Sequence, residues 1–420
     1  MPKDINWDNL LEKLFLKKNN LSSAERLIQN LKIKDYIFSF KNVLKFPELI
    51  ISVTGTNGKS SVCYFLNQML KSKFKKRALF ISPHIISVQE RIKINDKEIS
   101  KDDFLDIYFQ HLEFIEKNRL NFFQILFLIA VFYFFTNNID LLILEYGIGA
   151  KYDCCNIFEK QISVISTIGV DHQRFLGSTK EEVAENKKAI MRQNSLLVCN
   201  ISDKKIFSLL DHYAKQLNSQ VINISDTFKI LETGTDFIRF SYLNQEYQIF
   251  STAEFQAKNL VIAIAIANTL NIKYSLIKDE VNKIKFLPGR AEILKIKDKT
   301  IILDGAHNIE ASFNFSKYLR KNYNHRQSLI FLALLKDKNV EDILKIYVNQ
   351  KINCYLVNCS SLHDRFLSYN DLFKLKNKYN LNILDFKDIA KTLPKLTETI
   401  ICFTGSLMFI SYLKNKHTLN

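Results

Sequence analysis

The sequence contains few residues that break a chain or cross-link it. Its 420 residues include 10 glycines, 5 prolines and 7 cysteines. This composition excludes collagen-like and low-complexity chains and is typical of a globular protein. The number of cysteines is odd and no Cys-x-x-Cys pair is present, which argues against a disulfide framework or a zinc site. We therefore expect reduced cysteines and a cytoplasmic protein.

Long hydrophobic runs are also absent. The most apolar segment covers residues 122–135 and includes Gln124, whereas a membrane-spanning helix needs about 20 apolar residues. Residues 1–16 mix acidic and basic side chains and lack the apolar centre of a signal peptide. We expect a buried helix at 122–135 and no membrane partner.

The chain has an excess of positive charge, with 59 Lys and Arg against 43 Asp and Glu and a net charge of +16. Basic proteins attract phosphates. The lysines are nevertheless scattered, and Asn, Ile, Lys and Phe are abundant together, which indicates a compositional bias. We expect a basic surface around an anionic small molecule, no nucleic-acid partner, and a monomer.

Apolar strands alternate with helices along most of the chain, which predicts an α/β fold with a central, mostly parallel sheet covered on both faces. Helices are expected within 1–46 and at 62–70, 104–119, 122–135 and 260–270. Strands are expected at 49–53, 78–81, 140–145, 161–168, 300–303, 328–334, 354–358 and 399–403. Residues 221–250 have the pattern of a small antiparallel hairpin at the sheet edge.

The clearest interruption is Leu-Pro-Gly-Arg at 287–290. Proline and glycine together mark turns between elements. We place the domain junction there, which predicts a first domain over residues 1–288. The remainder, 289–420, has the strand and helix pattern of a smaller, Rossmann-like α/β domain.

The strongest local signal is a strand, a glycine-containing loop and a helix at 49–70. Gly55 and Gly58 allow backbone N–H groups to point at phosphate oxygens, and the helix start adds its positive dipole end. Lys59 supplies a point charge, and Ser60 or Ser61 a hydroxyl near a metal ion. A full Walker motif needs Gly where this chain has Val, at position 53, so the loop is a shortened variant.

The loop sequence Thr-Gly-Thr-Asn-Gly-Lys at 54–59 resembles the phosphate loop of the Mur-ligase superfamily. Within that superfamily, Ser-Pro-His-Ile at 82–85 resembles the folylpolyglutamate synthase/dihydrofolate synthase family. The similarity continues, in family order, at 89–92, 144–149, 153–156, 171–172, 176–177, 287–290, 304–308, 335–338 and 404–407. The resemblance implies a Mur-ligase-like, ATP-binding first domain.

A metal site is expected beside this loop. Glu145 follows an apolar run, so it lies at the carboxyl end of a central strand, where a buried carboxylate favours a cation. The resemblance implies that Ser82, Glu145 and His172 bind Mg²⁺, although histidine is an unusual ligand for this ion. It also implies that Lys187 is carbamylated and offers a further oxygen. The residues alone leave open a solvated helix face, or Lys188 as the modified residue.

The resemblance also implies the roles of other residues. ATP contacts are implied for Thr56, Asn57, Gly58, Lys59, Ser60, Ser61, Asn259, Arg290 and Asp304. The expected catalytic residues are Lys59, Glu145, His172, Lys187 and His307, and the substrate side is expected to involve Phe123, Gln124 and Asp153. A purely structural capping role for Asp304 stays open.

The activity implied is ATP- and Mg²⁺-dependent ligation of L-glutamate to dihydropteroate or a folate. The substrate carboxylate attacks the γ-phosphorus, and the amine of glutamate then displaces phosphate from the acyl phosphate. The pterin half of the pattern departs from the family, because Gln124 replaces a carboxylate and residues 20–24 do not match. Two alternatives stay open: another amide ligase of the superfamily, or a nucleotide-binding homologue without catalysis.

Overall fold

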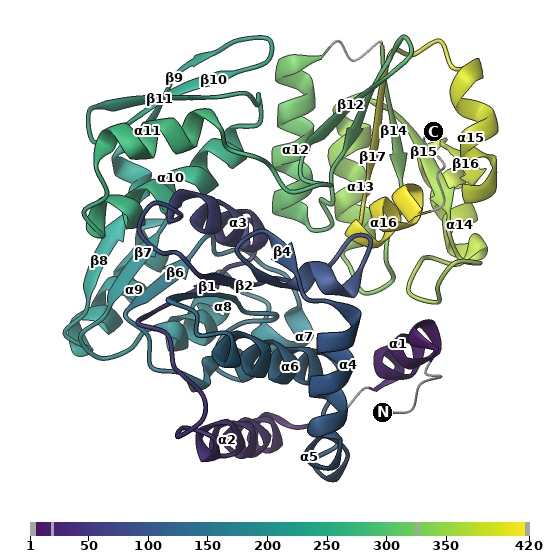
Figure 1. Cartoon of the computed structure of the whole chain (residues 1–420). Helices are drawn as coiled ribbons and strands as arrows, with labels where there is room; N and C mark the ends of the chain where they lie inside the picture. Colours follow the sequence, from purple (N-terminus) through teal and green to yellow (C-terminus); the bar gives the residue numbers. More distant parts are fainter. Residues whose placement is uncertain (1–5, 18–20, 324–326, 416–420) are drawn as a thin grey trace.

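The computed structural model describes residues 6–17, 21–323 and 327–415. Two α/β units lie side by side, each with its own sheet (Figure 1). The strands of the second sheet all follow Gly289, the residue at which the sequence predicts the second domain to begin.

The large sheet of the first unit runs in the order β4-β3-β2-β5-β1-β6-β7-β8. Its strands are β1 (Leu49–Thr54), β2 (Arg77–Phe80), β3 (Ile92–Ile94), β4 (Lys97–Glu98), β5 (Leu141–Glu145), β6 (Ile162–Ile165), β7 (Leu196–Cys199) and β8 (Gln220–Asn223). From β2 to β8 in this order the strands are parallel, which confirms the expected fold class. The antiparallel edge formed by β3 and β4 was not expected from the sequence.

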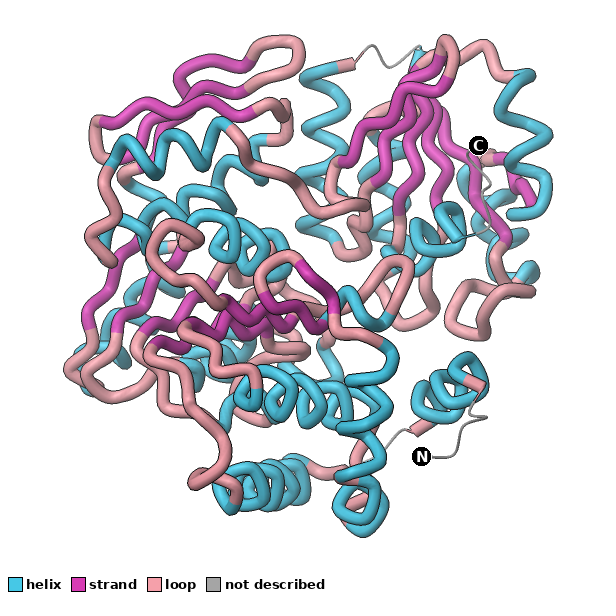
Figure 2. The backbone as a smooth tube through the Cα atoms, viewed as in Figure 1, coloured by secondary structure: helices cyan, strands magenta, loops and turns pink. Residues whose placement is uncertain are grey.

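Helices cover both faces of this sheet (Figure 2). The helices of the first unit are α1 (Trp7–Leu16), α2 (Ser23–Ser39), α3 (Lys59–Met69), α4 (Lys101–Gln110), α5 (Leu112–Lys117), α6 (Phe122–Thr136), α7 (Gln173–Leu176), α8 (Lys180–Lys187), α9 (Lys204–Gln216), α10 (Glu254–Thr269) and α11 (Tyr274–Asn282). Alternate residues of β5 point to opposite faces of the sheet. Leu142 and Leu144 belong to the core cluster that includes α6, whereas Leu141 and Ile143 belong to the one that includes α3 and α10.

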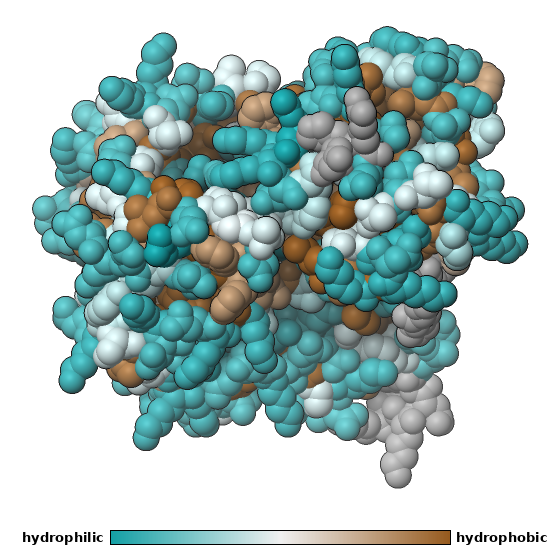
Figure 3. Space-filling view, turned by 90° about the horizontal axis from the view of Figure 1, so that it is seen from above, coloured by the Kyte–Doolittle hydropathy of each residue, from teal (hydrophilic) through white to brown (hydrophobic). Residues whose placement is uncertain are grey.

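Helix α6 accounts for the most apolar segment of the sequence. Most of its side chains are buried, as expected for a core helix that is apolar all round. Among the described helices, none combines the length and the apolar character needed to cross a membrane. Hydrophilic side chains cover most of the face seen in Figure 3, and hydrophobic ones form small separate groups.

Two details of the first unit differ from the sequence-based expectation. The single helix expected at 104–119 is two helices, α4 and α5, which meet at His111. Residues 228–249 form a separate antiparallel sheet of β9 (Phe228–Thr233), β10 (Ile238–Tyr242) and β11 (Gln245–Ile249), not a hairpin on the large sheet. The turn between β10 and β11 has positive φ at Leu243 and Asn244, as in tight two-residue hairpins.

The second unit contains a six-stranded sheet in the order β12-β13-β17-β14-β15-β16. The strands are β12 (Glu292–Ile296), β13 (Lys299–Leu303), β14 (Ser328–Leu332), β15 (Asn353–Asn358), β16 (Asn382–Asp385) and β17 (Ile400–Thr404). The helices are α12 (Ile309–Asn322), α13 (Val340–Asn349), α14 (Tyr369–Tyr379), α15 (Ile389–Thr392) and α16 (Leu407–Asn415). Only the β12–β13 pair is antiparallel among the described strand pairs of this sheet.

The two units meet where their parallel strands end. Residues after β1 and β6 of the first unit contact residues after β13 and β14 of the second, as in Asn57 with Asn308 and Asp171 with Lys338. Open α/β sheets bind ligands beyond the carboxyl ends of their strands. The junction therefore brings together the two edges at which a ligand site is expected.

Candidate active site

The phosphate loop between β1 and α3 is packed so closely that two positions require glycine. Gly58 precedes α3 with φ 84°, and a Cβ there would lie 2.4 Å from Asn259 Oδ1. A Cβ on Gly55 would lie 1.9 Å from Ser166 Oγ. The loop is fixed from the other side as well, because the Asn57 N–H donates to Thr167 Oγ1 over 2.9 Å. The loop therefore has the shape that its glycines allow, and residues distant in the sequence hold it there.

A buried lysine, Lys187, and a half-buried one, Lys59, converge on the same loop carbonyl. Nζ of Lys59 and Nζ of Lys187 donate to the Gly55 oxygen over 3.1 and 2.8 Å. Burial lowers the pKa of Lys59, although Glu145 opposes this shift. Burial, and then the charge of Lys59, lower the pKa of Lys187 well below its usual range. Lys188, in contrast, follows α8 and pairs with Glu185 of that helix over 2.7 Å, so the buried environment belongs to Lys187.

Glu145 lies at the carboxyl end of β5, 1% exposed. Its Oε1 accepts a hydrogen bond from the Ser60 hydroxyl over 2.9 Å, and its Oε2 accepts one from the Ser82 N–H over 2.8 Å. Burial raises the pKa of Glu145, and Lys59 opposes that shift. The loop, the Ser82 segment and the end of β5 therefore share one carboxylate.

Asp171 and His172 follow β6 and face the second unit. His172 has φ 50°, and burial lowers its pKa to about 4, so the imidazole is neutral near pH 7. Asp171 Oδ1 lies 2.6 Å from Lys338 Nζ, and Oδ2 accepts from Asn308 Nδ2 over 3.1 Å. Burial raises the pKa of Asp171, but His307, His172 and Lys338 together hold it well below its usual range.

The second unit contributes an arginine and a carboxylate at the junction. Burial lowers the pKa of Arg290, while Asp304 and Glu145 raise it. Asp304 accepts hydrogen bonds from the N–H groups of Ala291 and Ala306 over 2.8 and 2.9 Å. Burial raises the pKa of Asp304 to about 6, with Arg290 opposing. These bonds supply the capping role that the sequence left open for Asp304.

His307 is oriented by its own backbone. Its Nδ1 lies 2.8 Å from the Gly305 oxygen, which makes Nδ1 the donor and leaves Nε2 facing Asp171 Oδ2 at 3.5 Å. The ring therefore offers Nε2 to the junction.

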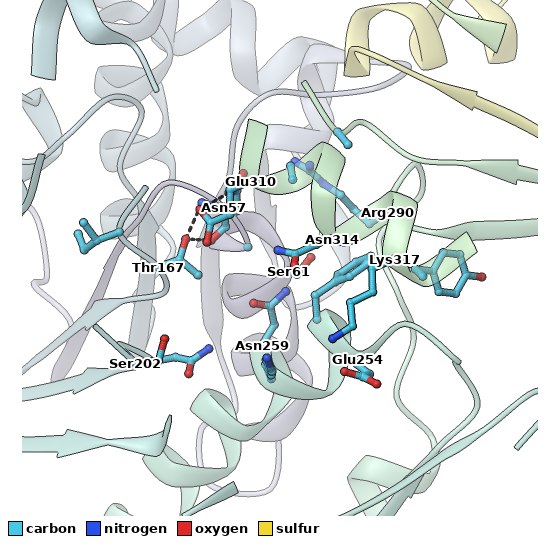
Figure 4. Close-up of a pocket in the computed structure, with 18 of the residues that line it drawn as sticks. Asn57, Ser61, Thr167, Ser202, Glu254, Asn259, Arg290, Glu310, Asn314 and Lys317 are labelled. Atoms are coloured by element: carbon cyan, nitrogen blue, oxygen red, sulfur yellow. Dashed lines mark hydrogen bonds between the residues drawn. The ribbon is translucent and has the colours of Figure 1, made fainter. Parts of the chain in front are cut away.

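A cavity of about 430 Å³ lies at the junction. Residues expected to bind nucleotide line it: Asn57, Gly58, Ser61, Asn259, Arg290 and Asp304, together with His307. Figure 4 shows Asn57, Ser61 and Asn259 from the first unit opposite Arg290, Glu310 and Lys317 from the second. The cavity is thus walled by both units.

The residues expected on the substrate side divide into two groups. Phe123 and Asp153 both contact Gly147, where the Asp153 carboxylate accepts the N–H over 2.9 Å and a Cβ would lie 3.1 Å from the Phe123 ring. Gln124 is buried, its Oε1 accepts the Asn121 N–H, and its Nε2 donates to Gln29 Oε1 over 2.7 Å. These bonds cap α6 and give no support to the substrate contact expected for Gln124, which stays a prediction.

One cluster outside the loop has metal-binding residue types, namely Asp153, Cys154 and Cys155. Burial raises the pKa of both thiols, so they remain protonated at neutral pH. Asp153 is already engaged by the N–H groups of Gly147, Ile148 and Cys155. The cluster therefore serves as a cap of the short turn at 154–157.

The structure also brings residues to the site that the sequence analysis did not single out by role. Asn308 and Lys338 lie in motifs at 304–308 and 335–338, and that was their only signal. Glu310 had none: its Oε2 accepts from Asn57 Nδ2 over 3.0 Å. The spacing of residues along the sequence does not tell which side chains meet across a domain junction. These contacts could therefore be identified only in the structure.

The fold and the loop define a nucleotide-binding α/β protein of two units. Residues 53–273 match the Mur ligase middle domain, and residues 290–413 match the C-terminal domain of dihydrofolate synthetase. The chain belongs to the Mur ligase family.

Individual relatives and solved structures resemble this chain over nearly its whole length. The dihydrofolate synthase/folylpolyglutamate synthase of Buchnera aphidicola subsp. Schizaphis graminum is 28% identical over 412 residues, which cover 97% of this chain and 94% of that protein. The folylpolyglutamate synthase structure from Thermotoga maritima is 25% identical, with a TM-score of 0.80 over 97% of this chain and 95% of that one. A bifunctional folylpolyglutamate synthase/dihydrofolate synthase, solved with Mn, AMPPNP and L-glutamate bound, is 20% identical with a TM-score of 0.79 over 98% of both chains.

These findings confirm the resemblance to the folylpolyglutamate synthase/dihydrofolate synthase family and the expectation of a ligase. They concern whole chains and not single residues. The role of each site residue therefore stays a prediction.

Proposed function

We propose that this enzyme uses ATP to join L-glutamate to the carboxylate of dihydropteroate or of a folate. The observation that carries the proposal is the cavity of about 430 Å³, in which the phosphate loop faces Arg290, Asp304 and His307 of the second unit. A site with a phosphate loop on one wall and cationic groups on the other suits transfer of a phosphoryl group between two anions. The named relatives support the choice of substrates.

Residues at and beyond the carboxyl ends of β5, β6 and β2 fit a divalent cation. Glu145 supplies a buried carboxylate, His172 a neutral imidazole, and Ser82 a hydroxyl that has no protein partner among the described residues. A hard cation prefers oxygen donors, and a buried carboxylate without one is costly. We assign Mg²⁺ to Ser82, Glu145 and His172, where it would supply positive charge between the phosphates and the attacking carboxylate.

Lys187 fits the carbamate that the resemblance implies. The amine attacks CO₂ and loses a proton, so the reaction requires a neutral amine, and burial favours that form. The product is an anion, which the nearby Lys59 would stabilise. A ¹³C-bicarbonate NMR signal that is present in the wild type and in Lys188→Met, and missing in Lys187→Met, would support this assignment.

Each remaining group has a proposed task in the reaction. The loop N–H groups and Lys59 hold the phosphates, and Arg290 approaches them from the second unit. His307 offers Nε2 to the junction, where it can orient the incoming glutamate. Phe123 and Asp153 shape the loop at Gly147 on the acceptor side. Docking of the second unit excludes water from the acyl phosphate.

The deciding experiment is glutamate-dependent release of ADP with dihydropteroate as acceptor. The expected result is turnover that needs all three substrates and is lost in Lys59→Ala with the fold retained. Turnover with another carboxylate but not with dihydropteroate would indicate a different amide ligase of the superfamily. ADP binding without turnover on any acceptor would indicate a homologue that has lost catalysis.

We also propose a cytoplasmic location and a monomeric state. All seven cysteines are free and buried, which suits a reducing compartment. Light scattering of the purified chain measures the oligomeric state directly.

A further inference from the structure

Lys338 extends from the second unit into the site of the first. It lies between β14 and α13, and its ammonium is 2.6 Å from Asp171 Oδ1, with the two side chains 5% and 8% exposed. Burial removes water from both charges, so each depends on the other for compensation. Removing one partner of a buried ion pair is strongly destabilising, because the other charge is then left buried and unpaired.

The same carboxylate also fixes the turn at His172. Asp171 Oδ1 accepts the His172 N–H over 2.7 Å, and Oδ2 accepts from Asn308 of the second unit. His172 has φ 50°, a conformation that residues other than glycine adopt only with support from their surroundings. Lys338 and the His172 N–H therefore bind the same oxygen atom.

We propose that Lys338 is a positioning residue that acts through Asp171 to hold the His172 turn, so that docking of the second unit completes the metal side of the site. This inference rests on the metal role proposed above for His172. It predicts that metal affinity depends on a lysine that does not touch the metal. Partners that orient a metal ligand change metal affinity by about 10- to 100-fold when they are mutated.

The test is Mn²⁺ binding to the full-length chain, followed by electron paramagnetic resonance of the free ion. Lys338→Met keeps the length of the side chain and removes its charge, and it is expected to raise the dissociation constant of Mn²⁺ about tenfold or more. Lys338→Arg keeps the charge and should bind Mn²⁺ nearly as well as the wild type. Lys336→Met is the matched control, because Lys336 lies exposed in the same loop, and it should not change binding.

Three outcomes separate the inference from the proposed function. Mn²⁺ binding that is absent in the wild type, or unchanged in His172→Ala, would contradict the metal role itself. Normal Mn²⁺ binding by Lys338→Met, with binding weakened in His172→Ala, would overturn the role of Lys338 alone. A raised KM for glutamate with unchanged Mn²⁺ affinity would also overturn it, because Lys338 would then serve the substrate.

A second variant covers the case in which Lys338→Met does not fold. Asp171→Asn combined with Lys338→Met removes both charges, so no unpaired charge remains buried. The double variant is expected to fold and to bind Mn²⁺ as weakly as Asp171→Asn alone. Wild-type affinity in the double variant would contradict the inference.

Discussion

Glu310 places a negative charge beside a loop built for phosphates. It lies in the first turn of α12, lines the cavity, and accepts a hydrogen bond from Asn57 over 3.0 Å. Burial raises the pKa of this carboxyl group. Gly169 leaves room for the Glu310 carboxylate, since a Cβ there would lie 2.3 Å from Oε2. The contact joins the two units but opposes the approach of a polyphosphate.

We expect Glu310→Gln to lower the KM for ATP. The amide still accepts from Asn57 but carries no charge. The repulsion between two unit charges about 4 Å apart in water amounts to about 1 kcal/mol, or about fivefold in affinity. Steady-state kinetics with ATP varied measures the effect. Glu232→Gln, on the exposed strand β9, is the control and should leave the KM unchanged. A higher KM in Glu310→Gln would mean that the carboxylate takes part in binding.

At the scale of elements, α6 shows how a cap and a substrate contact compete for one side chain. The Asn121 side chain accepts the Gln124 N–H, and the Gln124 side chain accepts the Asn121 N–H, both over 3.0 Å. This reciprocal pair is a capping box. Gln124 also donates to Gln29 of α2, so the same amide links two helices.

Gln124→Glu distinguishes the two roles. Glutamate keeps the cap but replaces the donor that faces Gln29 Oε1, and a buried polar group that loses its partner costs about 1–3 kcal/mol. We expect urea denaturation to show a lower free energy of unfolding by about that amount, with an unchanged KM for dihydropteroate. A lower KM for dihydropteroate with unchanged stability would instead support the substrate contact suggested by the sequence.

His111, at the break between α4 and α5, makes the stability of the first unit depend on pH. Its ring stacks on Phe132 with centroids 3.8 Å apart, and Nδ1 lies 2.9 Å from the Tyr36 hydroxyl. Burial lowers the pKa of His111 from 6.5 to about 4. Between these values the unfolded chain binds a proton that the folded chain does not. Stability is therefore retained above pH 6.5 and lost as the pH falls toward 4.

Replacing this histidine should flatten the acid side of the stability curve. Each pH unit in the window changes the free energy of unfolding by up to about 1.4 kcal/mol, so we expect the wild type to lose about 2 kcal/mol more than His111→Gln between pH 6.5 and 4.5. Denaturation at a series of pH values measures the difference. His212→Gln, exposed on α9, should follow the wild type. Parallel curves for His111→Gln and wild type would contradict the buried, neutral ring.

The same elements show what the sequence could and could not predict. Strands such as β1 and β5 and the buried helix α6 follow from apolar runs, and the loop at Gly55 follows from its glycines. The break at His111 could not be predicted from the sequence, because the apolar pattern continues through both α4 and α5. The separate sheet of β9 to β11 could not be predicted either, since alternating apolar and polar residues indicate a strand but not the strand with which it pairs. Contacts across the junction depend on both units at once.

At the scale of the whole molecule, the start of α10 ties the two units together beside the cavity. Ala253 packs in a core cluster of the second unit, and Gln256 donates to the Arg290 backbone oxygen over 2.9 Å. Glu254 lies 2.6 Å from Lys321 of α12. The charges of one carboxylate from each unit, Asp304 and Glu145, both raise the pKa of Arg290. A nucleotide in the cavity would therefore contact both units and stabilise their docking.

Nucleotide binding should accordingly raise the free energy of unfolding of the whole chain, and much of that gain should depend on Arg290. A ligand that binds only the folded state adds about 2.7 kcal/mol when its concentration is a hundred times its dissociation constant. We expect ADP at the concentration that gives this gain in the wild type to give distinctly less in Arg290→Lys, because lysine keeps the charge but cannot present the planar set of donors to phosphate. Arg239→Lys, exposed on β10, is the control and should show the full gain. Differential scanning calorimetry with and without ADP measures all three proteins, and the stabilities without ADP show whether the substitution harms the fold by itself. If Arg290→Lys kept the full gain, Arg290 would serve only to neutralise Asp304 and Glu145, and the nucleotide would be held by the first unit alone.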